Sequence, residues 1–228
     1  MNRQGADSKT DRFSKSAVIV AHPDDETLWA GGTILIHPET NWTVVSLCRG
    51  SDIDRSAKFF KAMEILNATG RMGDVDDSCE LKELTENEIE NTILGLLGNQ
   101  QFDLIITHSP TGEYTSHLRH EQTANAVIKL WQQGKIIAEQ LHMFAYDDAG
   151  GRLLPEAISS ADRIFQLPDV IWRAKHKIIT EIYGFDNDSY EARIVPHTEA
   201  FWSLRLIDQT TKKLTKIRKA KDESTCSL

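Results

Sequence analysis

The chain has 228 residues, a length that predicts one large domain or at most two small ones. Its apolar content of 40% is enough for a substantial core, and 34 acidic against 26 basic side chains give a net charge of −8. This balance argues against a general nucleic-acid binder, which needs a basic surface to neutralise phosphates, but it does not exclude a small neutral substrate.

Neither the apolar runs nor the cysteines indicate export. No run approaches the roughly 20 apolar residues that span a bilayer, and the polar N-terminus lacks the apolar segment of a secretory signal. The three cysteines, Cys48, Cys79 and Cys226, are far apart and form no metal-binding or disulfide pattern. We therefore predict a cytoplasmic protein without stable membrane insertion, in which Cys48 is a small buried hydrophobe.

Apolar strand patterns alternate with helical patterns along the chain. The predicted strands span residues 16–21, 42–48, 102–107 and 141–146, with a fifth candidate at 163–167. The predicted helices span residues 25–36, 55–69, 87–97, 116–131 and 169–183, and an acidic connector covers 74–80. This order predicts a single Rossmann-like α/β domain with a mostly parallel sheet and helices on both faces.

Local features set the expected ends of these elements. Asp24 or Asp25 can cap the first helix, and His37-Pro38 ends it. Gly31-Gly32 lies inside that helix, where two glycines cost stability unless they allow a close approach of the helix to the sheet. Gly70 is expected to stop the second helix.

Three segments divide the chain. Residues 1–15 are predicted to form a flexible N-terminal arm, residues 16–208 the folded domain, and residues 209–228 a basic, flexible tail. A polybasic tail can touch a membrane or a nucleic acid, but a solvated terminal segment is the simpler interpretation of such a charge run.

The first predicted strand runs directly into ligand-type residues, in the stretch SAVIVAHPDDE. Ligands of open α/β sheets bind beyond the carboxyl ends of the strands, and His and Asp suit zinc or a similar divalent metal. His22 and Asp25 can aim at one point across a tight turn, whereas Asp24 between them points differently. We therefore predict His22 and Asp25 as metal ligands and Asp24 as the base that takes a proton from water.

A second pair of candidates starts a later helix. His117 and His120 are three positions apart, so they share one helix face, which continues through the apolar residues Ala124, Val127 and Trp131. One of these histidines can complete the metal shell, and the other can protonate a leaving group or bind an oxyanion. An isolated H-x-x-H is a weak signal, but its position after an apolar strand strengthens it when combined with the first turn.

The stretch AHPDDE at residues 21–26 resembles the signature of the PIG-L/LmbE-like N-deacetylases. The resemblance continues in Thr33, in Arg55 and in FDLIITHSPTGEYTSHLRH at residues 102–120, and it covers roughly residues 16–205. It implies a zinc-dependent enzyme.

Site residues follow from that resemblance. It implies three zinc ligands, His22, Asp25 and His120. It also implies that Asp24 is the general base and that His117 supports the tetrahedral intermediate and the departing amine. Arg55 resembles the arginine that holds substrate hydroxyls or phosphate.

Two positions depart from the family pattern. Many members have H-P-D-H as the second motif, whereas this chain has Arg119 in place of the acid. We expect Arg119 to point outward, because it falls off the helix face of residues 117, 120 and 124. Lys58 stands where the helix that begins near Arg55 usually carries a glutamate.

Three functions are candidates for this chain. The first is a metal-dependent hydrolase that removes an acetyl group from an N-acetylated sugar of the N-acetylglucosamine type by zinc-activated water; other divalent metals accept the same ligands. The second is a zinc amidase acting on a non-sugar amide or a glycoconjugate. The third, a non-catalytic Rossmann-like nucleotide-binding module, would need a glycine-rich first turn, whereas the carboxylates found there would repel a pyrophosphate. The expected partner is a small N-acetylated molecule and not a nucleic acid, and a homo-oligomer is compatible with the sequence.

Overall fold

The computed structural model describes residues 13–77, 84–114 and 117–205, together with Leu214 and Ile217. Most of the predicted arm and tail lies outside the described residues, as do Cys79, Cys226 and the start of the helix predicted from Ser116. Within the described ranges, no helix is long and apolar enough to cross a membrane.

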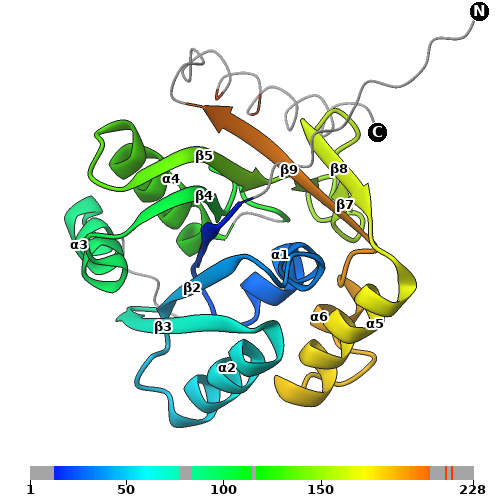
Figure 1. The fold of residues 1–228 in the computed structure, drawn as a ribbon. Coiled ribbons are helices and arrows are strands. Elements are labelled where there is room, and N and C mark those ends of the chain that lie inside the picture. Colours follow the sequence, from blue (N-terminus) through cyan, green and yellow to red (C-terminus); the bar gives the residue numbers. More distant parts are fainter. Residues whose placement is uncertain (1–12, 78–83, 115–116, 206–213, 215–216, 218–228) are drawn as a thin grey trace, which may run out of the picture.

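A central sheet organises the described part of the chain (Figure 1). Its seven strands follow the order β3-β2-β1-β4-β5-β9-β8, in which β3 to β5 run parallel, β9 is antiparallel to β5, and β8 is antiparallel to β9. The strands are β1 (Lys15–Val20), β2 (Asn41–Cys48), β3 (Ala68–Val75), β4 (Gln101–Thr107), β5 (Ile137–Phe144), β8 (Arg163–Gln166) and β9 (Thr198–Arg205). A separate short pair consists of β6 (Tyr146–Asp147) and β7 (Glu156–Ala157).

Helices cover both faces of the sheet, as predicted (Figure 1). One face carries α3 and α4, and the other carries α1, α2 and α5. The helices are α1 (Asp25–Ile36), α2 (Ile53–Leu66), α3 (Glu86–Leu97), α4 (Leu118–Gln132), α5 (Asp169–Lys177), its π-helical continuation η1 (Ile178–Ile182), and α6 (Tyr190–Arg193). The mostly parallel α/β fold predicted from the sequence is therefore confirmed.

Strand β1 lies at the centre of the core. Its side chains alternate between the two faces: Ala17 and Ile19 join the cluster under α3 and α4, and Val18 and Val20 join the cluster under α1 and α2. All four are 0% exposed. Full burial of a Val or Ile side chain contributes about 1.5–3 kcal/mol, so β1 holds the two layers together and fixes where its own carboxyl end lies.

The second helix ends earlier than predicted because a strand follows it. Helix α2 stops at Leu66, and Asn67 adopts a left-handed conformation with φ 51°. Gly70 does not stop the helix but lies in β3, where a Cβ atom would come within 2.7 Å of Met63 and 2.8 Å of Phe59. The missing side chain at Gly70 thus allows α2 to pack against the edge strand.

Helical spacing in the last long helix predicts an inward face made of Val170, Ile171, Ala174, Ile178 and Ile182, and this prediction is partly wrong. Val170 is 72% exposed, whereas Lys175, Ile178 and Ile179 are buried. The ammonium of Lys175 lies 2.6 Å from Oε1 of Glu199, and both side chains are 0% exposed. A buried ammonium requires such a partner, because an unpaired charge in the interior is strongly unfavourable.

Glu199 also joins α1 to this pair. Its carboxylate accepts hydrogen bonds from the backbone N–H of Gly32 at 2.7 Å and from the N–H and hydroxyl of Thr33 at 2.7 and 2.6 Å. A Cβ atom on Gly32 would lie 2.4 Å from Leu167 and 2.8 Å from Oε1 of Glu199. The close approach expected of the paired glycines is therefore found at Gly32.

Replacing each of the two glycines by alanine separates packing from helix propensity. We expect Gly32→Ala to lower the free energy of unfolding by about 1–3 kcal/mol, because the new methyl group overlaps Leu167. Gly31→Ala is the matched control: its nearest neighbours would be 3.4 Å away, in ordinary contact, so the change should be neutral or stabilise the helix by up to about 1 kcal/mol. Urea denaturation measures both, and equal effects of the two variants would contradict this packing.

Candidate functional site

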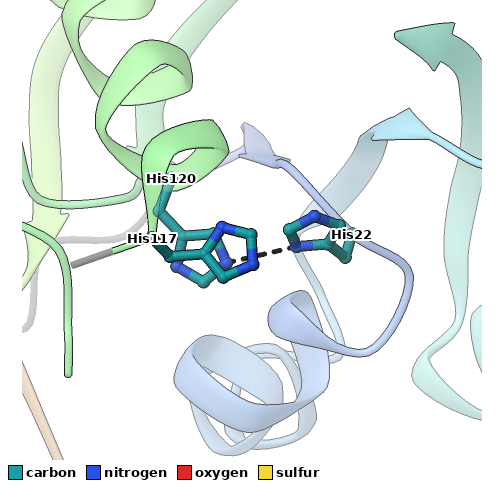
Figure 2. Close-up of side chains that lie close together, drawn as sticks. All are labelled: His22, His117 and His120. Atoms are coloured by element: carbon teal, nitrogen blue, oxygen red, sulfur yellow. Dashed lines mark hydrogen bonds between the residues drawn. The ribbon is translucent and has the colours of Figure 1, made fainter. Parts of the chain in front are cut away.

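The candidate site lies where the strand order of the sheet reverses. Strands β1 and β4 are adjacent and parallel, so their carboxyl ends meet at one edge. The chain leaves β1 towards α1 on one face and leaves β4 towards α4 on the other face, which opens a crevice between the two exits. Figure 2 shows His22, which follows β1, facing His117 and His120 at the start of α4.

Three donor atoms converge in this crevice. Nδ1 of His22 lies 3.2 Å from Oδ2 of Asp25 and 3.2 Å from Nε2 of His120, and the latter two atoms are 3.3 Å apart. Ligand atoms of a tetrahedral zinc ion, at bonds of about 2.0–2.1 Å, are separated by about 3.3–3.4 Å. The spacing of these donors therefore matches what such an ion requires.

A buried carboxylate orients His120. Oε2 of Glu113 lies 2.8 Å from Nδ1 of His120 and 3.0 Å from Nδ1 of His108, and Oε1 accepts the N–H of Ser109 at 2.8 Å. Burial opposes ionisation of Glu113, but the two histidines outweigh it and lower the pKa to about 2. An acceptor at Nδ1 places the proton of His120 there and leaves the Nε2 lone pair facing Asp25.

His108 contacts both the end of the first strand and Asp25. It is 0% exposed, and its Nε2 accepts the backbone N–H of Ala21 at 2.9 Å while lying 3.5 Å from Oδ2 of Asp25. Asp25, His108 and His120 also form a second group of closely spaced donors. Because the N–H of Ala21 occupies the Nε2 lone pair, His108 fits a supporting position better than a ligand position.

Sequence reasoning did not identify His108 or Glu113. The available signal was the position of His108 directly after the apolar strand β4, which parallels the position of His22 just beyond β1. Glu113 had no comparable signal, since its partners become visible only when the loop is folded.

Asp24 occupies a constrained turn. Its backbone has φ 126°, a conformation that costs a non-glycine residue about 1–3 kcal/mol, and its N–H donates to Oε2 of Glu26 at 3.0 Å. Burial raises the pKa of Asp24, as do the carboxylates of Asp25 and Glu26. Asp24 stands at the N-cap of α1, but its side chain makes no capping bond.

A cavity of about 280 Å³ opens beside the converging donors. His117 and Arg55 line it, the latter with its nearest guanidinium nitrogen 3.9 Å from Oδ2 of Asp24. The ring of His117 lies 4.7 Å from that of His22, and burial together with the neighbouring His120 and His22 lowers the pKa of His117 to about 4. In the described part of the chain, Nδ1 of His117 is buried without a hydrogen-bond partner, so a polar ligand in the cavity could satisfy it.

The structure brings all six residues singled out in the sequence to this place. Five of them line the cavity, namely His22, Asp24, Asp25, Arg55 and His117, and the sixth, His120, is fully buried behind them. Their chemical roles stay predictions.

The expected outward orientation of Arg119 is wrong. The side chain is 1% exposed, and its Nε donates to the backbone oxygen of Asp76 at 2.5 Å while Nη1 donates to Gln122 at 2.6 Å. Asp76, which directly follows β3, lies against Arg119 at the beginning of α4, so a side chain that does not face the sheet is nevertheless enclosed. Helix periodicity alone does not reveal such a cover.

Fold and site together define a Rossmann-like α/β protein that carries a histidine–carboxylate cluster of metal-ligand type at the switch point of its sheet. The PIG-L family, described as GlcNAc-PI de-N-acetylase, matches residues 17–131, which is half of the chain. The protein belongs to this family.

Other similarities are more distant. The uncharacterized protein L374 of Acanthamoeba polyphaga mimivirus is 22% identical over 178 residues, which cover 71% of this chain and 75% of that protein. The N,N′-diacetylchitobiose deacetylase of Pyrococcus horikoshii has a TM-score of 0.67 at 17% identity and covers 88% of each chain.

Two further structures share the fold. A deacetylase of the teicoplanin biosynthesis pathway has a TM-score of 0.63 at 14% identity, covering 86% of this chain and 100% of the other. GalB, the 4-carboxy-2-hydroxymuconate hydratase of Pseudomonas putida, has a TM-score of 0.58 at 18% identity, covering 83% and 96%. Since a hydratase and deacetylases have the same architecture, the fold alone does not determine the reaction.

Replacing Glu113 by glutamine tests the buried support of His120. The amide has one acceptor where the carboxylate has two, so it cannot accept from both His120 and Ser109, and we expect the free energy of unfolding to fall by about 1–3 kcal/mol. The matched control is Glu139→Gln, at an exposed position near the start of β5, which should change stability by no more than about 0.5 kcal/mol. Chemical denaturation compares the two, and a neutral Glu113→Gln would contradict the hydrogen-bond network.

Proposed function

We propose that this protein is a zinc-dependent N-deacetylase that removes an acetyl group from an N-acetylated sugar of the N-acetylglucosamine type. The observation that carries the proposal is the triangle of donor atoms from His22, Asp25 and His120 beside a cavity walled by Asp24 and His117. Membership of a family described as a de-N-acetylase and the likeness to two deacetylase structures support it.

The ligands proposed for the metal are His22, Asp25 and His120. These residues would hold the ion beside the cavity, and three protein ligands next to an accessible space are the pattern of a catalytic rather than a structural zinc site. When bound, a divalent ion supplies Lewis-acid polarisation of the amide carbonyl and lowers the pKa of water. Iron and other divalent metals accept the same donor set, so zinc is the proposal and not the sole ion that fits.

The remaining steps use the protein's own side chains. Asp24 takes one proton from the attacking water while the oxygen atom of that water bonds to the acetamide carbon. The C–N bond then breaks as the departing nitrogen receives the proton that Asp24 took from water, and the new carboxyl group loses its remaining proton to solvent. His117 lies on the cavity wall beside His22, where it can hydrogen-bond the carbonyl oxygen or assist the departing amine. The products are acetate and a primary amine.

The composition of the cavity supports a sugar. Aromatic side chains of Tyr114, Phe185 and Tyr190 line it together with Arg55. Flat aromatic surfaces pack against the C–H faces of a sugar ring, and the arginine can bind its hydroxyl groups or an attached phosphate. A volume of about 280 Å³ lies at the small end of ligand pockets, which suits the acetamido group and an adjoining ring rather than a bulky substrate.

The Asp24→Asn variant tests the proposed base. Asparagine preserves the shape but cannot accept the proton of water, so we expect turnover to fall by about 10²–10⁴-fold while the metal content is retained. Acetate release and elemental analysis measure the two properties. Asp54→Asn, an exposed change on α2, is the control and should keep full activity. Unchanged acetate release by Asp24→Asn would refute the role.

Metal removal and a substrate panel test the reaction itself. We expect the protein to release primary amine from N-acetylglucosamine glycosides. This release should stop after the metal is removed with a chelator and resume when zinc is added. Faster hydrolysis of simple acyl amides would instead indicate the amidase alternative. A protein that neither binds zinc nor releases amine from any member of the panel would overturn the proposal.

A further inference from the structure

Asp77 contacts the outer nitrogen of His22. It follows the end of β3, and its Oδ1 lies 3.0 Å from Nε2 of His22, with the Asp77 side chain 15% exposed. Nδ1 of His22 faces Asp25 and His120, as the dashed line to His120 in Figure 2 illustrates. The ring proton therefore belongs on Nε2, where it is donated to Asp77.

Two arginines hold Asp77 and its neighbour in place. Arg49 donates from Nε and Nη2 to Oδ2 of Asp77, both at 3.2 Å, which leaves Oδ1 for His22. Arg119 donates from Nε to the backbone oxygen of Asp76, the residue directly before Asp77, and its Nη2 lies 3.8 Å from the Asp76 carboxylate. Arg119 thus ties the segment that carries Asp77 to the helix that carries His120.

We propose that Asp77 is a positioning residue for His22, and that Arg119 acts through Asp77 by fixing the segment after β3 against α4. The proposal rests on the proposed function, since it concerns the histidine assigned to the metal. The proposal also gives a role to Arg119, which stands where many family members have an acid. Arg119 holds the segment after β3 and does not act on His117.

The arrangement repeats what Glu113 does for His120. Each of the two histidine ligands presents one nitrogen to the donor triangle and the other to a carboxylate from a different loop. Such carboxylates fix the ring orientation and the tautomer of a metal-binding histidine. In metalloenzymes, loss of such a carboxylate lowers metal affinity or activity by about 10–100-fold. The carboxylates of Asp77 and Glu113 therefore hold the two imidazoles before a metal arrives.

A purely structural role predicts a different behaviour. Arg49 is 42% exposed, so its ion pair with Asp77 would by itself stabilise the fold only slightly and would not affect metal binding. Zinc affinity, measured by competition with a chromophoric chelator, separates the two roles because it does not depend on substrate or turnover.

The Asp77 variants are the first test. We expect Asp77→Ala to weaken zinc binding by about 10–100-fold with little change in thermal unfolding. Asp77→Asn should recover most of the affinity, because the amide oxygen can accept the same proton from Nε2 while Arg49, which is 42% exposed, loses its acceptor to water rather than in a buried site. Asp54→Ala, an equal loss of charge on the exposed surface of α2, should bind zinc like the unmodified protein. Equal affinities of Asp77→Ala and the unmodified protein would overturn the proposal.

A double-mutant cycle tests whether Arg119 acts through Asp77. Arg119→Lys keeps the charge but loses the Nε–H that reaches Asp76, and Arg119→Gln serves as a second replacement if the lysine variant does not fold. We expect either change to weaken zinc binding in the presence of Asp77 and to add nothing to the loss in Asp77→Ala. Additive losses would overturn the coupling.

The proposed function and the positioning role of Asp77 can be overturned separately. If the unmodified protein binds no divalent metal, the proposed function falls. If it binds zinc and the Asp77 and Arg119 variants bind equally well, the proposed function stands and only the positioning role is overturned.

Discussion

One carboxylate oxygen connects most of the site. Oδ2 of Asp25 accepts the backbone N–H of His22 at 2.9 Å and lies 3.2–3.5 Å from ring nitrogens of His22, His120 and His108. Burial works against charge on Asp25, but His120 and His108 hold its pKa well below the usual range. The exits of β1 and β4 are both organised around this single anion, so displacement of either loop would disturb all the donors together.

The position of that oxygen depends on helix α1, whose first residue is Asp25. The helix is held at its far half by Glu199, which is itself neutralised by Lys175. Three elements, α1, α5 and β9, thus meet at one buried ion pair. Such a pair adds little net stability, because both ions lose hydration, but breaking it is costly. The main effect of the Lys175–Glu199 pair is to fix the position of α1 on the sheet.

How far the sequence predicts this molecule depends on where the partners of each residue lie. Strands β1, β2 and β4 are apolar runs, and the meeting of His22 with His120 follows from the parallel strand ends. Strand β3 contains two glycines and an arginine, so no apolar pattern marks it. The same limit applies to Arg119, which pairs with a loop whose path no periodicity encodes, and to Glu113, whose partners come together only in the folded loop.

The anchor of α1 has a consequence for the order in which the protein is made. Synthesis proceeds from the N-terminus, so the growing chain contains His22, Asp25 and His120 long before Glu199 appears in the last strand of the sheet. Until then the helix that begins at Asp25 lacks its buried acceptor, and the Lys175 ammonium lacks its counterion. Maturation of the cluster that follows β1 and β4 therefore waits for a strand that is synthesised after both of them.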